Sequence, residues 1–162
     1  MKIQPTRREI SLINRRMVLS ACLAVPLLAA AAAPKAQVVV YKSASCGCCK
    51  EWVKHLEKAG FTTEVHDLDN LGPTKERVGI PAAMGSCHTA EVGGYFVEGH
   101  VPADDIKRLL RERPNAKGLT VPGMPVGSPG MEVPSGQVAP YDVVLVSKDG
   151  KTSVYAHHGP KS

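Results

Sequence analysis

Three of the chain's five cysteines fall within four residues, Cys46–Cys49, and the residues around them limit how this stretch can fold. The β-branched run Gln37–Lys42 before them is typical of a buried strand. A helical pattern begins at Cys48 and ends near Gly60, which is well placed to close a helix. An alternating strand over 61–67 follows. Strand, helix and strand within about 30 residues predict a βαβ unit with two parallel strands.

Two further helices and two hairpins are expected after this unit: helices over 70–78 and 102–113, and strand pairs 89–92 with 95–98 and 141–147 with 152–156. The dipeptide Gly93-Gly94 joins the first strand pair in a tight turn. Residues 118–140 are rich in Gly and Pro without a period, which predicts an irregular segment. The order βαβα-ββα predicts an α/β chain with a thioredoxin-like three-layer fold, a mixed sheet and an extra C-terminal β-hairpin. We expect a single domain over 37–162.

Residues 1–33 have the charge pattern of an export signal. A basic stretch is followed by an apolar run over 17–33 that ends in alanines, which predicts a cleaved secretory signal peptide and a periplasmic protein. The pair Arg15-Arg16 is similar to a twin-arginine signal. A retained membrane anchor and a lipoprotein modified at Cys22 are the alternatives. Because the apolar run is short and contains Pro26, we expect no stable membrane insertion after cleavage.

The net charge depends on that segment. The whole chain has 20 Lys and Arg against 15 Asp and Glu, a formal charge of +5. Five of the basic residues and one of the acidic residues lie in 1–33, so the remainder has 15 and 14, a formal charge of +1. This balance, without a basic stripe or a nucleic-acid-binding motif, argues against a nucleic-acid partner. Cys22 also leaves with the signal.

The spacing C-x-x-C at a turn from strand to helix is typical of thioredoxin-like redox sites. A helix N-terminus favours an anion, so it stabilises a thiolate and lowers the pKa of a thiol placed there. Cys46 and Cys49 are therefore candidate catalytic residues of a thiol–disulfide oxidoreductase, although exchange does not require Cys48. Two structural disulfides among the four cysteines are an alternative in an oxidising compartment, but vicinal and C-x-C bridges are strained. At most one bridge fits within the cluster, for instance Cys46–Cys49 or one to Cys87.

A fourth cysteine follows later in the pair Cys87-His88, after Ile80-Pro81. In thioredoxin-like folds the cis-proline loop takes this place and passes close to the C-x-x-C turn, so Cys87 and the first three cysteines are expected to converge. Thiolates together with imidazole and thioether groups select Cu(I) or Zn(II). The soft ligands Met124 and Met131 favour copper in a periplasm, while ordinary packing is their other interpretation. A structural zinc domain stays open as an alternative.

The remaining histidines differ in their surroundings. His100 follows a strand and stands just before a helix, so it is a candidate ligand. We expect a surface or helix-end role for His55 and a satisfied structural role within a strand for His66. His157 and His158 lie near the C-terminus, where a frayed tail is expected.

Several strings occur in order along residues 37–133: Cys46-Gly-Cys-Cys-Lys-Glu-Trp52, Gly85-Ser-Cys-His-Thr89, Glu98-Gly-His-Val-Pro102 and Val121-Pro-Gly-Met-Pro125. They resemble the CopG-like family, small periplasmic proteins from copper-resistance gene clusters. This resemblance implies a thioredoxin-like fold that binds copper through its cysteines. It also implies a multinuclear, thiolate-bridged cluster that can change its redox state.

By this resemblance the thiolate ligands are Cys46, Cys48, Cys49 and Cys87. The resemblance places four further candidate ligands at nearby motif positions: His88, His100, Met124 and Met131. The sequence therefore predicts a periplasmic copper-binding protein in copper tolerance, which holds Cu(I) and interconverts Cu(I) and Cu(II). Its expected partners are copper ions and other periplasmic copper-handling proteins. The alternative is a metal-free thiol–disulfide oxidoreductase that uses the pair Cys46 and Cys49.

Overall fold

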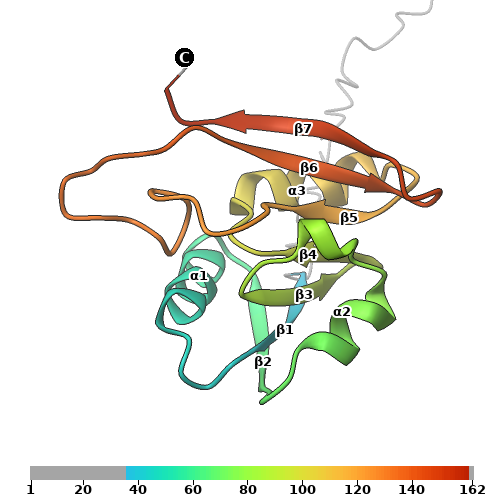
Figure 1. Cartoon of the computed structure of the whole chain (residues 1–162), viewed down its shortest axis with the longest axis horizontal. Helices are drawn as coiled ribbons and strands as arrows, with labels where there is room; N and C mark the ends of the chain where they lie inside the picture. The colour runs from blue at the N-terminus through green and yellow to red at the C-terminus, as the bar shows by residue number, and fades with distance from the viewer. Residues whose placement is uncertain (1–35, 161–162) are drawn as a thin grey trace, which may run out of the picture. The chain divides into compact units, whose positions relative to one another are not determined.

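The computed structural model describes residues 36–160, so the predicted signal peptide lies outside the described residues. The elements in chain order are β1 (Gln37–Lys42), α1 (Gly47–Lys58), β2 (Thr62–Asp67), α2 (Gly72–Val78), a 3₁₀ turn (Ala82–Met84), β3 (His88–Val92), β4 (Tyr95–Glu98), α3 (Ala103–Glu112), β5 (Ala116–Thr120), β6 (Tyr141–Ser147) and β7 (Thr152–His158). All the strands belong to one sheet, with the order β2-β1-β3-β4-β5-β6-β7 (Figure 1). No helix in this part of the chain is long and apolar enough to cross a membrane.

The sheet is mixed. β1 pairs with β2 in parallel, as the predicted βαβ unit requires, and β4 pairs with β5 in parallel. The other neighbours are antiparallel, including the β3–β4 hairpin turned by Gly93 and Gly94, both at positive φ. The α/β class, the mixed sheet and the C-terminal hairpin are thus confirmed, and the thioredoxin-like assignment stays a prediction.

Helices cover both faces of the sheet. The apolar sides of α1 and α3 pack on one face, where Trp52, Leu56 and Ile106 meet Val40 and Val97 in a single core. On the other face, α2 contacts β3 and β4 through polar pairs. Lys75 reaches Thr89 of β3 and Glu98 of β4, and Arg77 reaches Glu91 of β3. Lys42, the last residue of β1, pairs with His88, the first residue of β3, so the N-terminal end of α1 and the loop before β3 lie at neighbouring strand ends.

One strand was not expected. Residues 118–140 were predicted to be irregular, but Ala116–Thr120 forms β5 and pairs with β4. The short sequence of β5 shows no clear alternation, because Gly118 occupies its centre. A Cβ at Gly118 would lie 2.0 Å from the carbonyl oxygen of Phe96, so only glycine fits against β4 here. A tertiary contact, not a local pattern, determines this strand.

The segment before Cys87 also differs from expectation. The peptide bond before Pro81 is trans, as are the other described peptide bonds, so Ile80-Pro81 does not form a cis-proline loop. A 3₁₀ turn over 82–84 follows instead and leads to β3. The segment nevertheless brings Cys87 to the N-terminus of α1, where its Sγ lies 3.5 Å from that of Cys49.

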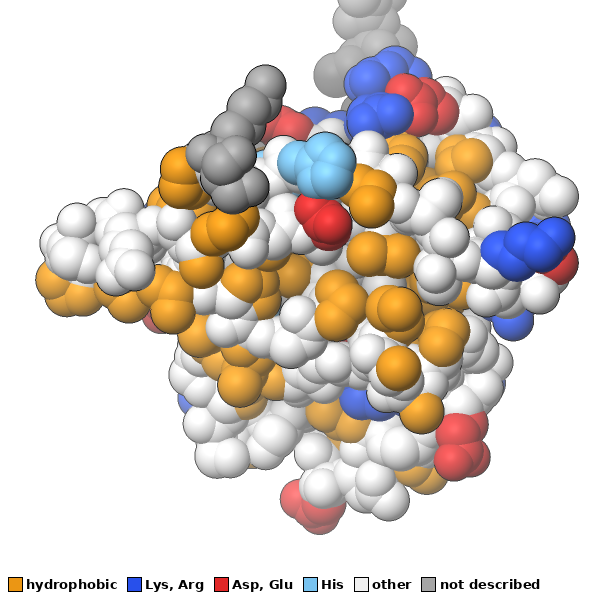
Figure 2. All heavy atoms as spheres, turned by 45° about the horizontal axis from the view of Figure 1, so that its top comes forward, with side chains coloured by type: hydrophobic (Ala, Val, Ile, Leu, Met, Phe, Trp, Pro, Cys, Tyr) orange, Lys and Arg blue, Asp and Glu red, His pale blue; other side chains and the backbone are white. Residues whose placement is uncertain are grey.

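The β6–β7 hairpin extends the sheet and packs against α3. The Arg108 guanidinium lies 4.1 Å from the centre of the Tyr155 ring, and the Tyr155 hydroxyl donates a hydrogen bond to Glu112 at 3.1 Å. Figure 2 looks onto the side of the molecule that includes the hairpin and shows hydrophobic side chains at the surface. Val154 of β7 has about half of its surface exposed.

Candidate metal centre

The four cysteine sulfurs meet between the N-terminus of α1 and the start of β3. Cys46 is the N-cap of α1 and its Sγ accepts the backbone N–H of Cys49 at 3.4 Å. Cys46 and Cys49 form a disulfide, while Cys48 and Cys87 are free thiols. The Sγ of Cys87 lies 3.9 Å from that of Cys48 and 3.5 Å from that of Cys49. The expected convergence of Cys87 with the other three cysteines is therefore present, with one disulfide rather than two.

Two imidazoles approach Cys87 from the other side. Its Sγ lies 3.3 Å from Nδ1 of His88 and 3.1 Å from Nε2 of His100. Both rings are fully buried, and their planes are nearly perpendicular, with centres 5.0 Å apart. Cys87 thus lies at the junction of two groups whose potential ligand atoms fall within 4.8 Å of one another: the four cysteines, and Cys87 with the two histidines.

His88 has an unusual environment. Its ring stacks at a tilt on Trp52, with centres 4.3 Å apart, and its Nε2 has no hydrogen-bond partner. Burial, followed by the charges of His100 and Lys75, lowers the pKa of His88 to about 3. The imidazole is therefore neutral at physiological pH. A neutral imidazole is the form that binds a metal.

His100 is oriented by the segment between β5 and β6. Its Nδ1 donates a hydrogen bond to the carbonyl oxygen of Pro129 at 2.9 Å, which leaves the lone pair on Nε2, the atom that faces Cys87. Burial lowers the pKa of His100, against the opposing effects of the Pro129 carbonyl and of Glu132. An imidazole fixed through one nitrogen with the other free is the arrangement typical of histidine ligands.

The Cys87 thiol is protonated in the metal-free protein. Burial, and next the neighbouring Cys48, raise the pKa of Cys87 to about 12. The predicted stabilisation of a thiolate by the N-terminus of α1 therefore does not extend to Cys87, which belongs to a different loop. A metal that binds here has to displace the thiol proton, so its binding releases protons.

The two methionines occupy different positions. Met124 has about half of its surface exposed and lines a depression with Pro125 and Tyr141. Met131 is partly buried and follows Gly130, whose Cα packs against the backbone of α1 beside the cysteines. The ligand role of both methionines stays a prediction.

Sequence reasoning missed a buried ion pair beneath the site. Glu98, the last residue of β4, is fully buried and forms an ion pair with Lys75 of α2. Its carboxylate also accepts the backbone N–H of Ser86 at 2.5 Å and the hydroxyl of Thr89 at 2.7 Å. Burial raises the pKa of Glu98, against the lowering effect of these three donors. The available signals were a glutamate at the end of an otherwise apolar strand and the place of Glu98 in the string Glu98–Pro102.

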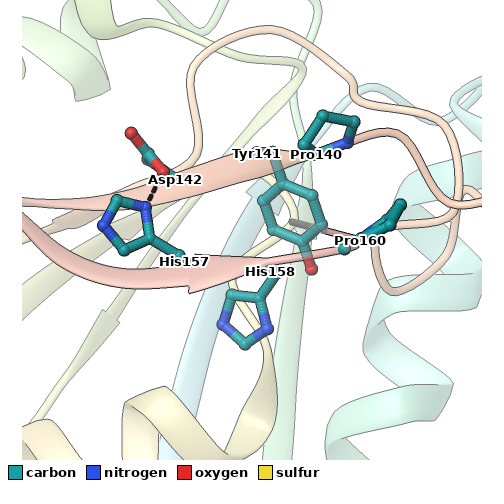
Figure 3. Close-up of a pocket in the computed structure, with 7 residues that line it drawn as sticks. Pro140, Tyr141, Asp142, His157, His158 and Pro160 are labelled. Carbon is teal, nitrogen blue, oxygen red and sulfur yellow. Dashed lines mark hydrogen bonds and ion pairs between the residues drawn. The ribbon is translucent and has the colours of Figure 1, made fainter. Parts of the chain in front are cut away.

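The other histidines lie away from the cysteines. His66 belongs to β2 but is exposed, where it contacts Glu64, and His55 accepts a hydrogen bond from the backbone of α3. His157 and His158 were expected in a frayed tail but belong to β7, because the hairpin extends to residue 158. Figure 3 shows the His157 ring turned toward Asp142 and the His158 ring beside Tyr141. Nδ1 of His157 lies 2.6 Å from Oδ1 of Asp142.

The donor set of the centre suits a soft metal. Four sulfurs and two neutral imidazoles converge in a mostly buried space, with no carboxylate among the grouped atoms. Such ligands favour Cu(I) or Zn(II) over Mg²⁺ or Ca²⁺. The disulfide adds a second kind of chemistry, because Cys46 and Cys49 become available as ligands only after a two-electron reduction.

Comparisons with known proteins agree with this picture. Residues 84–131 match a family model described as a protein of unknown function, DUF411. A solved structure titled "Copper resistance protein copG- Form 2" is 48% identical to the chain, covers 77% of it and 99% of its own length, and has a TM-score of 0.74. The corresponding Form 1 structure is also 48% identical, with coverages of 76% and 98% and a TM-score of 0.72. The comparison with curated proteins found no match.

Proposed function

Because the chain belongs to the CopG copper-resistance family, we propose that it binds copper and acts in copper tolerance, with the cysteine cluster as the binding site. The single observation that supports this most is the convergence of four cysteine sulfurs within 4.8 Å of one another. The proposed ligands are Cys46, Cys48, Cys49 and Cys87, with further ligands among His88, His100, Met124 and Met131.

The disulfide supports a role in interconverting Cu(I) and Cu(II). In the reduced protein, the thiols of Cys46 and Cys49 hold two electrons and two protons. Two Cu(II) ions can each take one electron, which gives two Cu(I) ions, the Cys46–Cys49 disulfide and two released protons. In the reverse reaction, two Cu(I) ions each give one electron to the disulfide, which takes up two protons and returns the two thiols and two Cu(II) ions. The soft sulfur ligands favour the Cu(I) state.

The proposed location is the periplasm, where an export signal over 1–33 would deliver the protein. An extracytoplasmic location agrees with a disulfide next to a metal site, because disulfides persist in oxidising compartments. Copper ions, and other periplasmic copper-handling proteins, are the proposed partners.

A second candidate function is metal-free thiol–disulfide exchange by Cys46 and Cys49. The observation in its favour is that these two residues form the disulfide and that Cys46 is the N-cap of α1, where a thiolate is stabilised. This function requires neither Cys48 nor Cys87. Substitution of those two cysteines therefore separates the candidates.

The test is copper binding by the reduced protein. We expect wild-type protein, reduced and loaded with Cu(I) without oxygen, to retain copper through desalting in the presence of a competing chelator. Cys87→Ser removes the sulfur that joins both groups of potential ligands, so it should reduce the copper bound per chain and weaken retention by about 10-fold or more. His66→Asn, at an exposed histidine of β2, is the matched control and should bind as wild type does.

Two results would contradict the proposal. One is wild-type protein that retains no copper after reduction. The other is Cys87→Ser protein that binds copper like wild type. Turnover of a disulfide substrate that survives both Cys48→Ser and Cys87→Ser would support the oxidoreductase instead.

A further inference from the structure

Glu98 connects three separate parts of the chain beneath the cysteine cluster. One carboxylate oxygen accepts hydrogen bonds from Lys75 of α2 and from the backbone N–H of Ser86, and the other accepts the Thr89 hydroxyl. The side chain of Glu98 is fully buried and that of Lys75 is about one-fifth exposed. The ion pair therefore spans from α2 to the loop that immediately precedes Cys87.

The same loop is also attached to β5 and to the segment after β5, where the Gly123 amide donates to the Gly85 carbonyl oxygen at 3.3 Å. Its earlier part is held by the Thr120 hydroxyl, which donates to the carbonyl oxygen of Met84 at 2.7 Å. The Ser86 hydroxyl donates to the carbonyl oxygen of Gly123. On one side of Cys87 the Ser86 amide donates to Glu98, and on the other side the His88 carbonyl oxygen accepts the Gly99 amide at 3.0 Å. The bond to Glu98 is therefore one of the two flanking attachments that limit where the Cys87 sulfur can lie.

A purely structural role would not require a charge at this place. Burying a carboxylate has a large desolvation cost, and apolar side chains of similar size often stabilise a fold equally well. A nearby pair provides a comparison, because Arg77 of α2 and Glu91 of β3 connect the same helix to the same sheet at the surface. That pair contacts no residue of the loop before Cys87.

We propose that Glu98, held in place by Lys75, is a positioning residue that directs the Cys87 thiol toward the other cysteines and toward His100. Ligands of metal sites are commonly oriented by such hydrogen-bonded partners. The inference rests on the proposed function where it concerns copper. The position of Cys87 in the metal-free protein does not depend on that function.

The first measurement is the alkylation rate of Cys87 in metal-free protein with the disulfide intact, resolved from that of Cys48 by peptide mass spectrometry. The variant Lys75→Met/Glu98→Met removes both charges together and deprives the Ser86 amide of its acceptor. We expect Cys87 to react severalfold faster, because its loop becomes free to move into solvent, while the rate of Cys48 stays unchanged. Glu98→Gln retains an oxygen that can accept the Ser86 N–H, so it should restore a slow rate.

The matched control is Arg77→Met/Glu91→Met, which removes the neighbouring ion pair and should leave the Cys87 rate at its wild-type value. The melting temperatures of all variants show whether a faster alkylation of Cys87 only reflects a less stable fold. The proposal is overturned if Cys87 reacts at the wild-type rate in Lys75→Met/Glu98→Met. It is also overturned if the control pair accelerates Cys87 as much, or if Glu98→Gln behaves like the double substitution.

The second measurement is Cu(I) retention by the reduced variants against a chelator. We expect Lys75→Met/Glu98→Met to lose on the order of 10-fold in affinity and to alter the thiolate-to-copper absorption, with the control pair unchanged. Unaltered affinity and absorption in the double variant would overturn the role of Glu98 in the copper site. If wild-type protein binds no copper, the proposed function fails, and the alkylation result still decides whether Glu98 positions Cys87.

Discussion

His55 shows how one partly buried side chain connects two helices. Its Nε2 accepts the backbone N–H of Ala103 at 3.0 Å, at the start of α3. The N-cap of α3 is Pro102, which forms no side-chain capping bond, so the imidazole satisfies one of the free amides of the first turn. Burial lowers the pKa of His55, against the opposing charges of Glu132 and Asp104. The folded protein therefore favours neutral His55.

This residue gives the protein a pH-dependent stability. The pKa of His55 in the folded protein lies below the unfolded value of 6.5. The stabilisation that neutral His55 provides is therefore complete above pH 6.5 and is lost as the pH falls below that value. His55→Gln provides a non-titrating acceptor. We expect its melting temperature to fall less than that of wild type between about pH 7 and pH 5, as measured by calorimetry. His66→Gln, at an exposed histidine, should follow wild type. If the melting temperatures of His55→Gln and wild type fall equally between about pH 7 and pH 5, this role of His55 is refuted.

The segment between β5 and β6 packs on the N-terminal end of α1 through Gly130. Gly130 has a φ of +85°, and a Cβ there would lie 2.7 Å from both the carbonyl oxygen of Cys48 and the amide nitrogen of Trp52. The preceding residue, Pro129, accepts the hydrogen bond of His100. The segment therefore stabilises the helix end that includes the cysteines and orients one imidazole of the site.

We expect Gly130→Ala to destabilise the protein more than Gly123→Ala does. Gly123 has a similar φ of +71° but open space around it. Gly123→Ala therefore has only the cost of placing alanine in a left-handed conformation, about 1–2 kcal/mol. Gly130→Ala also has to displace the segment from α1, which should weaken Cu(I) retention as well. Urea unfolding of the metal-free proteins measures the difference. Equal free energies of unfolding would show that the close contact at Gly130 is unimportant.

Local patterns predicted most elements, and contacts between distant residues account for what was missed. The β1–α1–β2 unit and both hairpins follow from periodicity and turn residues. β5 was not predicted, because Gly118 at its centre is required by the close approach of Phe96 on β4, and the local sequence does not reveal this contact. In the site, the four cysteines and two histidines were named from motifs. The role of Glu98 was not predicted, because its donors Lys75 and Ser86 are 23 and 12 residues away in sequence.

At the scale of the whole molecule, α3 joins the core to the β6–β7 hairpin at one end of the sheet. Ile106 and Leu109 are buried in the core that contains Trp52, next to the cysteine cluster. On the same helix, Arg108 and Glu112 contact Tyr155 of the β6–β7 hairpin. The hairpin also continues the hydrogen-bonded sheet through β5. We therefore expect the hairpin and the core to unfold together, as one domain over 37–162.

Unfolding followed by two probes tests this expectation. Trp52 is the only tryptophan of the chain and is fully buried, so its fluorescence reports on the core. Trp52→Phe/Tyr155→Trp moves the indole to the hairpin. In each protein, the urea transition seen by fluorescence should coincide with that seen by far-ultraviolet circular dichroism, because a two-state domain gives the same transition by every probe. A lower midpoint for fluorescence in the Trp52→Phe/Tyr155→Trp protein alone would show that the hairpin unfolds first. The hairpin would then be a separate unit, and α3 would not couple it to the cysteine site.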